Sequence, residues 1–330
     1  MAQIVGLIAP LFGVILLGYV TARLKPEPIE ALGWLNIFIV YLALPALFIK
    51  IMAETPVEDL ANGRFILGVL LASTVILALG FILGLLVTRG SIPEATIQAL
   101  ASAYGNIGYM GPAVAILAFG EAAAAPVALI VCFENILYFT FAPAMMAIAG
   151  RSEAGAGGPA RGAAWLSAVR LAGQVAAKVL LHPFILAAAI GVALAVAEAS
   201  LPEPLERLID TLAQAAAPCA LFAMGVTLAL RPLRRAPAAL GFIAPLKLII
   251  HPILMYWTLV WIAGDAPFEP IWLATAVLLA SLPSATNVYV IASQYGVWLE
   301  RASASVLATT GFSLVTVSAA LWWLTKSGSF

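Results

Sequence analysis

Residues 103–114 read AYGNIGYMGPAV and lie inside an apolar stretch, 92–119, that is long enough to cross a membrane. Three glycines, an asparagine and a proline fall within residues 105–112. Proline removes a backbone donor and obstructs the carbonyl one turn before it, while glycine lowers the cost of non-helical dihedral angles. The segment therefore predicts a membrane helix that unwinds near its middle.

A second stretch of the same kind, SLPSATNVYV at 281–290, interrupts the apolar run 270–295. Unwound backbone at membrane depth survives only where protein buries it or where it lines a watered cavity. The freed amides and carbonyls, with the half-helix ends, can then bind a small solute or ion. A kink that serves packing alone is the alternative for each break. Because the breaks occupy corresponding places in two halves of the chain, we expect a binding site.

The composition indicates a polytopic membrane protein. Hydrophobic residues make up 63% and charged residues 10% of the 330 residues, with a mean hydropathy of +1.07, whereas charged residues are about a quarter of an ordinary soluble domain. Sixteen Lys and Arg balance sixteen Asp and Glu, so nothing indicates a nucleic-acid partner. Cys132 and Cys219 are far from any Cys/His cluster and are expected to be small buried hydrophobes, not metal ligands.

Ten apolar runs of about twenty residues or more, separated by polar loops, predict ten membrane-spanning helices. One longer connector, 150–172, contains RSEAGAGGPARGA and is expected to be a cytoplasmic linker. It separates a first five-helix unit, 1–149, from a second, 173–330. The predicted spans are 3–22, 31–52, 65–88, 92–119, 121–149, 173–197, 208–230, 238–263, 270–295 and 301–325.

Lysine and arginine are unevenly distributed over the predicted loops. The loops that follow odd-numbered spans carry ten of them, and the opposite side carries four. By the positive-inside rule, the richer side faces the cytoplasm and both chain termini lie outside. The ten are Arg23, Lys25, Arg89, Arg151, Arg161, Arg170, Arg231, Arg234, Arg235 and Arg301, and the four are Lys50, Arg64, Arg207 and Lys326.

The two halves of the chain resemble each other at a steady offset. Because five spans is an odd number, the second copy must enter the membrane from the opposite side, which is the inverted repeat typical of secondary transporters. Chance similarity between apolar sequences is the alternative, but three matches at nearly one offset favour a repeat. The matches are Pro10 and Gly18 with Pro183 and Gly191, Pro45 with Pro218 at the same offset, and Pro112 with Pro283 at a slightly shorter one.

Polar side chains at the two breaks are the candidate substrate-binding residues. Asn106 and Asn287 can each donate and accept hydrogen bonds, so the pair can hold a carboxylate with the help of half-helix N-termini. Pro112 and Pro283 mark the breaks themselves. The sequence leaves open whether the nearby aromatic residues line the cavity or pack between helices. These aromatic residues are Tyr104, Tyr109 and Tyr289.

Glu134, in FENILYF, and Lys247, in LKLIIHP, are expected near the membrane midplane, since a helix rises by about 1.5 Å per residue. Charge at that depth marks either function or an internal pair. Two interpretations stay open, a mutual Glu134–Lys247 salt bridge and a role in proton or substrate coupling. His251, one turn beyond Lys247, is either a hydrogen-bonded structural residue or a proton relay.

Several motifs, in order along the chain, resemble those of the auxin efflux carrier family, which includes plant PIN proteins and bacterial malonate-type permeases. The resemblance covers essentially the whole chain. It implies ten helices in two inverted five-helix repeats, as in bile-acid symporters and Na⁺/H⁺ antiporters, with the fourth and ninth helices broken and crossing. It also implies a scaffold of helices 1, 2, 6 and 7, against which helices 3–5 and 8–10 move as a transport domain. The motifs are PLFGVILLGYV, LALPALF, NIGYMGPA, HPFILAAAIGV, PCALFAMGVTL, LKLIIHP and LPSATNVYVIASQYG.

We therefore expect a secondary transporter of the bacterial inner membrane that moves a small organic anion by alternating access, with an elevator mechanism. A membrane sensor or receptor for a small carboxylate on the same scaffold is the alternative. An enzyme is not expected, because the sequence contains no HExxH, GxSxG or P-loop motif. No cofactor is expected, and coupling to Na⁺ or H⁺ and a homodimer stay open.

The predicted topology can be tested with single cysteines. A cysteine placed within 150–160 is expected to react only with reagents that reach the cytoplasm, and one placed after Lys326 only from outside, because ten spans with an odd repeat separate the two positions. The measurement is labelling of whole cells with a membrane-impermeant maleimide. Labelling of both positions from the same side would contradict the odd repeat.

Overall fold

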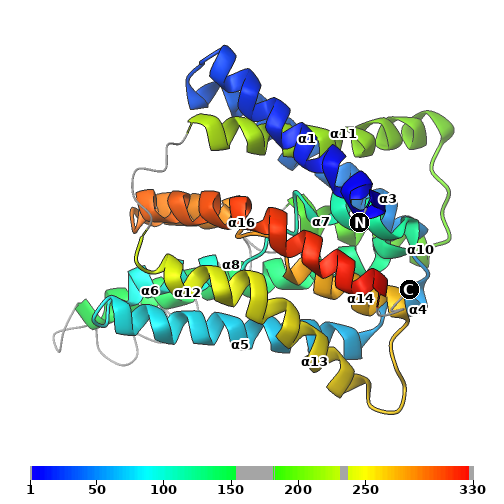
Figure 1. Ribbon diagram of the computed structural model, residues 1–330. Helices are drawn as coiled ribbons and strands as arrows, with labels where there is room; N and C mark the ends of the chain where they lie inside the picture. The colour runs from blue at the N-terminus through cyan, green and yellow to red at the C-terminus, as the bar shows by residue number, and fades with distance from the viewer. Residues whose placement is uncertain (1, 154–180, 182, 231–236, 327–330) are drawn as a thin grey trace.

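The computed structural model describes residues 2–153, 181, 183–230 and 237–326, and this part of the chain is helical and contains no β-strand (Figure 1). The predicted all-α fold class is therefore confirmed. Most of the predicted linker 150–172 and the first part of the predicted span 173–197 lie outside the described residues.

Six helical stretches of the described chain are long and apolar enough to cross a membrane. This makes the chain a multi-pass membrane protein, as predicted, whereas the count of ten crossings stays a prediction. Further helices are α1 (Ala2–Leu24), α10 (Pro183–Val196) and the short α4 (Val57–Leu60). The six candidate membrane spans are Ile29–Glu54, Gly63–Val87 (α5), Glu121–Gly150, Glu203–Leu230 (α11), Leu240–Ala263 and Leu299–Lys326 (α16). The third of them begins with η3 (Glu121–Ala123) and continues as α8 (Ala124–Glu153).

Two of the six stretches contain a π-helical turn just before a proline. Pro45 and Pro252 lack the amide hydrogen and press on the carbonyl one turn earlier, so the helix widens into a π-helical turn just before each of them. The first stretch consists of η1 (Ile29–Leu32), α2 (Gly33–Phe38), the π-turn η2 (Ile39–Ala43) and α3 (Leu44–Glu54), and the second of α12 (Leu240–Pro245), the π-turn η5 (Leu246–Ile250) and α13 (His251–Ala263).

The predicted spans 92–119 and 270–295 are each interrupted. The first consists of α6 (Ile92–Ala103) and α7 (Gly111–Phe119), and the second of α14 (Pro270–Ala280) and α15 (Thr286–Tyr295). Each interruption coincides with the glycine- or proline-containing segment that predicted it.

The two interruptions, 104–110 and 281–285, pair with each other. Gly105 and Ser284 form an antiparallel β-bridge. Two backbone hydrogen bonds, each 2.8 Å long, hold the bridge and occupy donors and acceptors that the broken helices leave free. They run from the amide of Asn106 to the carbonyl of Pro283 and from the amide of Ala285 to the carbonyl of Tyr104.

Glycines let α1 lie directly on α11, at the opposite side of the molecule from α5 and α13 (Figure 1). A side chain at Gly18 would collide with the carbonyl oxygen of Phe222. Between α3 and α10, a Cβ on Gly191 would lie 2.7 Å from the carbonyl oxygen of Ile49. The two contacts are related by one shift along the sequence. The number of residues from Gly18 to Gly191 equals the number from Ile49 to Phe222.

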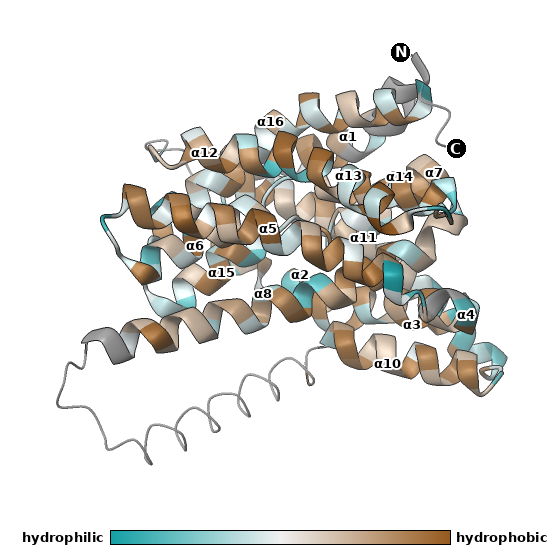
Figure 2. Cartoon of the chain, turned by 90° about the horizontal axis from the view of Figure 1, so that it is seen from below, coloured by the Kyte–Doolittle hydropathy of each residue, from teal (hydrophilic) through white to brown (hydrophobic). Residues whose placement is uncertain are grey.

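On the other side of the molecule, α5 packs against α6 through two glycines one turn apart. A Cβ on Gly80 would lie 2.8 Å from Cβ of Ser102, and one on Gly84 would lie 2.9 Å from Cα of Ala95. Hydrophobic residues cover most of the helix surfaces, and hydrophilic residues gather at the loops and helix ends (Figure 2). That distribution is the one expected of helices surrounded by lipid.

Gly18→Ala is expected to lower the melting temperature of the detergent-purified protein, because the added methyl group meets the backbone of α11; overpacking of this kind costs about 1–3 kcal/mol. Gly13→Ala in the same helix is the matched control, since nothing lies within 4 Å of a Cβ there. Alanine also favours helix over glycine by up to about 1 kcal/mol, so this variant is expected to melt no lower than wild type. Equal melting temperatures for the two variants would contradict the close approach of α1 and α11.

Candidate functional site

A cavity of about 630 Å³ lies beside the paired interruptions. Residues of η1, α2, η2, α8, α11, α15 and the break 104–110 line it, and none of the lining residues in the described part of the chain is acidic or basic. Its polar groups are tyrosine and threonine hydroxyls and four carboxamides. The carboxamides belong to Asn36, Asn106, Asn287 and Gln294.

Asn106 is a buried residue of the cavity wall with incomplete hydrogen bonding. Its Nδ2 lies 3.6 Å from Sδ of Met224 on α11, which is a weak acceptor, and its Oδ1 has no partner. An unsatisfied buried polar atom is costly. Because Oδ1 is an acceptor, a carboxylate in the cavity can pair with this amide only through the donor Nδ2, whose present acceptor is weak.

Asn287 and Thr286 bring the first turn of α15 to the cavity. The first amides of a helix have no acceptor within the helix, and the N-terminal end carries partial positive charge. Asn287 is also fixed from behind, since its Nδ2 donates a 2.7 Å hydrogen bond to the hydroxyl of Tyr104. This side of the cavity therefore presents oriented donors suited to an anion.

The three candidate tyrosines fall into two classes. Tyr109 and Tyr289 line the cavity, whereas Tyr104 is buried behind the wall, with its ring stacked on that of Tyr138 at 4.4 Å between centroids. The hydroxyl of Tyr104 donates to Oδ1 of Asn135 on α8. Asn135 was missed by the sequence analysis, although it follows Glu134 directly in FENILYF.

Pro112 and Pro283 are buried but do not line the cavity. Pro112 lies in the first turn of α7, where its missing amide hydrogen costs nothing. Pro283 contributes its carbonyl to the bridge with Asn106. The two prolines shape the backbone at the breaks, whereas the side chains of Asn106 and Asn287 provide polar groups in the cavity wall.

Glu134 and Lys247 are both buried, but they do not form the direct salt bridge that was one of the two interpretations. A chain of hydrogen bonds joins them instead. Ser73 on α5 donates to Oε1 of Glu134, and its Oγ lies 3.3 Å from Nε2 of His251. Nδ1 of His251 lies 3.0 Å from Nζ of Lys247. Three helices, α5, α8 and the α12–α13 stretch, thus contribute to one buried polar chain.

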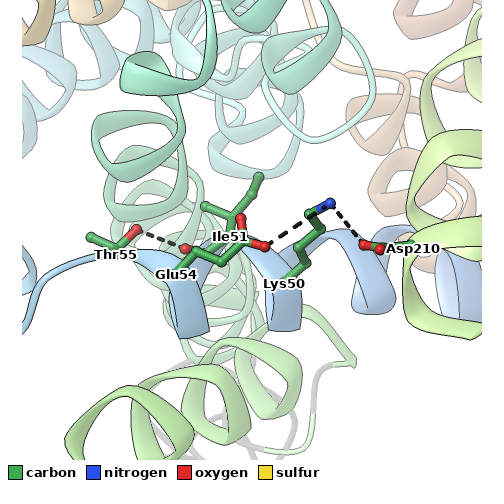
Figure 3. Close-up of polar contacts among 5 residues, drawn as sticks. All are labelled: Lys50, Ile51, Glu54, Thr55 and Asp210. Carbon is green, nitrogen blue, oxygen red and sulfur yellow. Dashed lines mark hydrogen bonds and ion pairs between the residues drawn. The ribbon is translucent and has the colours of Figure 1, made fainter. Parts of the chain in front are cut away.

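The end of α3 carries an ion pair to α11 (Figure 3). Nζ of Lys50 lies 2.7 Å from Oδ1 of Asp210 and 4.0 Å from Oε1 of Glu54. The side chains of Lys50 and Asp210 are each about one-third exposed, and ion pairs near water contribute little stability. Neither residue lines the cavity, so the pair joins α3 to α11 outside the site.

In the part of the chain that the structure describes, no group of three or more His, Cys, Asp or Glu residues is arranged to hold a metal ion. Cys132 and Cys219 lie on α8 and α11 as separate free thiols, each partly buried. The binding groups that the described site offers are thus amides, hydroxyls and a helix end.

Comparison with known proteins gives two matches over almost the whole chain. The family model described as membrane transport protein matches residues 3–322. A protein of Rhizobium meliloti described as "Putative malonate transporter" is 57% identical over 329 residues, which cover 100% of this chain and 98% of the relative.

Tyr104→Phe is expected to lower the stability of the purified protein by about 1–3 kcal/mol, because it keeps the ring but removes the hydrogen bonds to the buried Asn135 and the partly buried Asn287. Thermal melting in detergent measures the effect. Tyr41→Phe is the matched control, since Tyr41 lines the cavity but is 62% exposed. If both variants melt like wild type, the hydroxyl of Tyr104 does not organise the wall.

Proposed function

The chain belongs to the membrane transport protein family, and we propose that it carries a small organic anion such as malonate across the membrane. The family confirms the resemblance to auxin efflux carriers and makes the chain a transport protein, not an enzyme. The substrate class is taken from the relative whose name mentions malonate. The observation that carries the proposal is the cavity beside the paired breaks, with its amide groups and the first turn of α15.

The chemistry of the cavity suits a carboxylate. Asn106 and Asn287 supply amide donors from the two breaks, and the N-terminal turn of α15 supplies partial positive charge. A volume of about 630 Å³ is much larger than a three-carbon diacid needs, so the substrate shares the cavity with water in this state. The site then has to contract around the anion during transport.

With the orientation predicted from the positive-inside rule, the cavity faces the cytoplasm. Ile29 and Leu32, at the start of the Ile29–Glu54 stretch, and Tyr295, at the end of α15, all line it. Each lies near a connection on the side predicted to be cytoplasmic, 23–28 or 296–301. We therefore assign the structure to an inward-facing state of an alternating-access cycle.

We propose that two inverted repeats build the carrier. The equal sequence shift between the contacts of Gly18 with Phe222 and Ile49 with Gly191 supports it. In this mechanism α1, α3, α10 and α11 form a scaffold, and the unit that carries both broken helices moves against it.

The proposed function is tested by reconstitution. Purified protein in liposomes is expected to take up labelled malonate, and the assay is run with and without Na⁺ and pH gradients to identify coupling. A protein that binds malonate but never moves it would favour the sensor. A protein that neither binds nor moves malonate or other small carboxylates would contradict the assignment.

Asn106→Ala and Asn287→Ala are each expected to weaken malonate binding about ten- to a hundred-fold, which corresponds to one lost hydrogen bond to a charged group. A binding titration on purified protein measures the effect, beside a melting curve. Asn62→Ala is the matched control. The side chain of Asn62 accepts from the amide of Phe65 at the start of α5, outside the cavity, so its loss affects stability and not affinity. Wild-type affinity in both cavity variants would rule out this site.

A further inference from the structure

The ammonium group of Lys247 is held against the paired breaks. Lys247 is fully buried, whereas the other lysines in the described part of the chain, Lys25, Lys50 and Lys326, are at least partly exposed. Its Nζ donates a 2.7 Å hydrogen bond to the carbonyl of Ala280, the last residue of α14. The C-terminal end of a helix carries partial negative charge, so a cation there is favourable.

The same ammonium touches the other break as well. A Cβ on Gly105 would lie 3.2 Å from Nζ of Lys247, so a residue with a side chain at this position would press on the ammonium. Gly105 precedes Asn106, whose side chain forms part of the cavity wall. The π-helical turn η5 (Leu246–Ile250) includes Lys247 and sets the direction in which it leaves its helix. One residue of backbone thus separates the charge from the cavity wall.

No acidic side chain in the described chain pairs directly with this ammonium. Glu134 is reached only through His251 and Ser73. Because Ser73 donates to the carboxylate, its oxygen accepts from Nε2 of His251, and Nδ1 of His251 is left to accept from Lys247. The positive end of the chain therefore lies at the crossing, and the negative end lies further away on α8.

We propose that Lys247 is the resident counter-cation of the carboxylate site. Its positive charge attracts the substrate across the backbone of the paired breaks and so favours the binding of doubly charged over singly charged acids. A bound metal cation is then unnecessary. The inference rests on the proposed function. The described residues of the cavity lining carry no charge, so a dianion there needs a counter-charge from behind the wall. Charges a few ångströms apart interact strongly in the interior, where screening is weaker than in water. Lys247 acts as a positioning residue, since it does not line the cavity.

The test compares malonate with its monoamide, which has nearly the same size but one carboxylate instead of two. Wild-type protein is expected to bind malonate more tightly than the monoamide near neutral pH. Lys247→Met keeps the length of the side chain without its charge and is expected to weaken malonate binding about ten- to a hundred-fold, and monoamide binding distinctly less. Lys247→Arg is expected to retain the preference for the dianion. Lys50→Met is the matched control, with the same loss of charge outside the cavity, and is expected to leave both affinities unchanged.

Equal losses for the two ligands in Lys247→Met, or no loss, would overturn the inference, because a merely structural lysine does not distinguish ligand charge. A second measurement needs no variant. Wild-type protein is expected to bind malonate equally in Na⁺ and in N-methylglucamine, and a Na⁺ requirement would overturn the inference even if Lys247→Met does not fold. Failure of wild-type protein to bind malonate at all would instead contradict the proposed function.

Discussion

The structure depends on the pairing of two unwound segments inside a membrane protein. Breaking a helix at that depth frees backbone donors and acceptors that lipid cannot satisfy. The bridge between Gly105 and Ser284 solves this problem for both breaks at once, because each segment supplies partners to the other. The two broken helices, α6 with α7 and α14 with α15, therefore meet at their interruptions. The cavity lies where they do.

The local chemistry of the sequence was enough to predict where the helices break. Glycine and proline act within one turn, so GNIGYMGP and SLPSATNVYV located both interruptions, and Asn106 and Asn287 followed as cavity residues. The exact place of each proline was harder to predict. Pro112 lies in the first turn of α7, whereas Pro283 lies within the interruption between α14 and α15.

Contacts between distant helices could not be predicted from the sequence. Asn135, Ser73 and Met224 take part because of the rotation of α8, α5 and α11 about their axes, and hydropathy says little about rotation in helices that are apolar all round. The same limit applies to the direct contact considered for Glu134 and Lys247. Equal depth in the membrane suggested it, but His251 and Ser73 lie between them.

The two breaks differ in length, since one covers residues 104–110 and the other residues 281–285. A carrier with two identical halves would present the same binding surface to both sides of the membrane. In the proposed alternating-access cycle, unequal breaks give the site a different surface on each side of the membrane, and with it a different affinity and half-saturation concentration. At equal electrochemical potential of the substrate on both sides there is still no net flux. Away from equilibrium such a carrier rectifies, so that net transport runs faster in one direction than in the other under equal and opposite gradients.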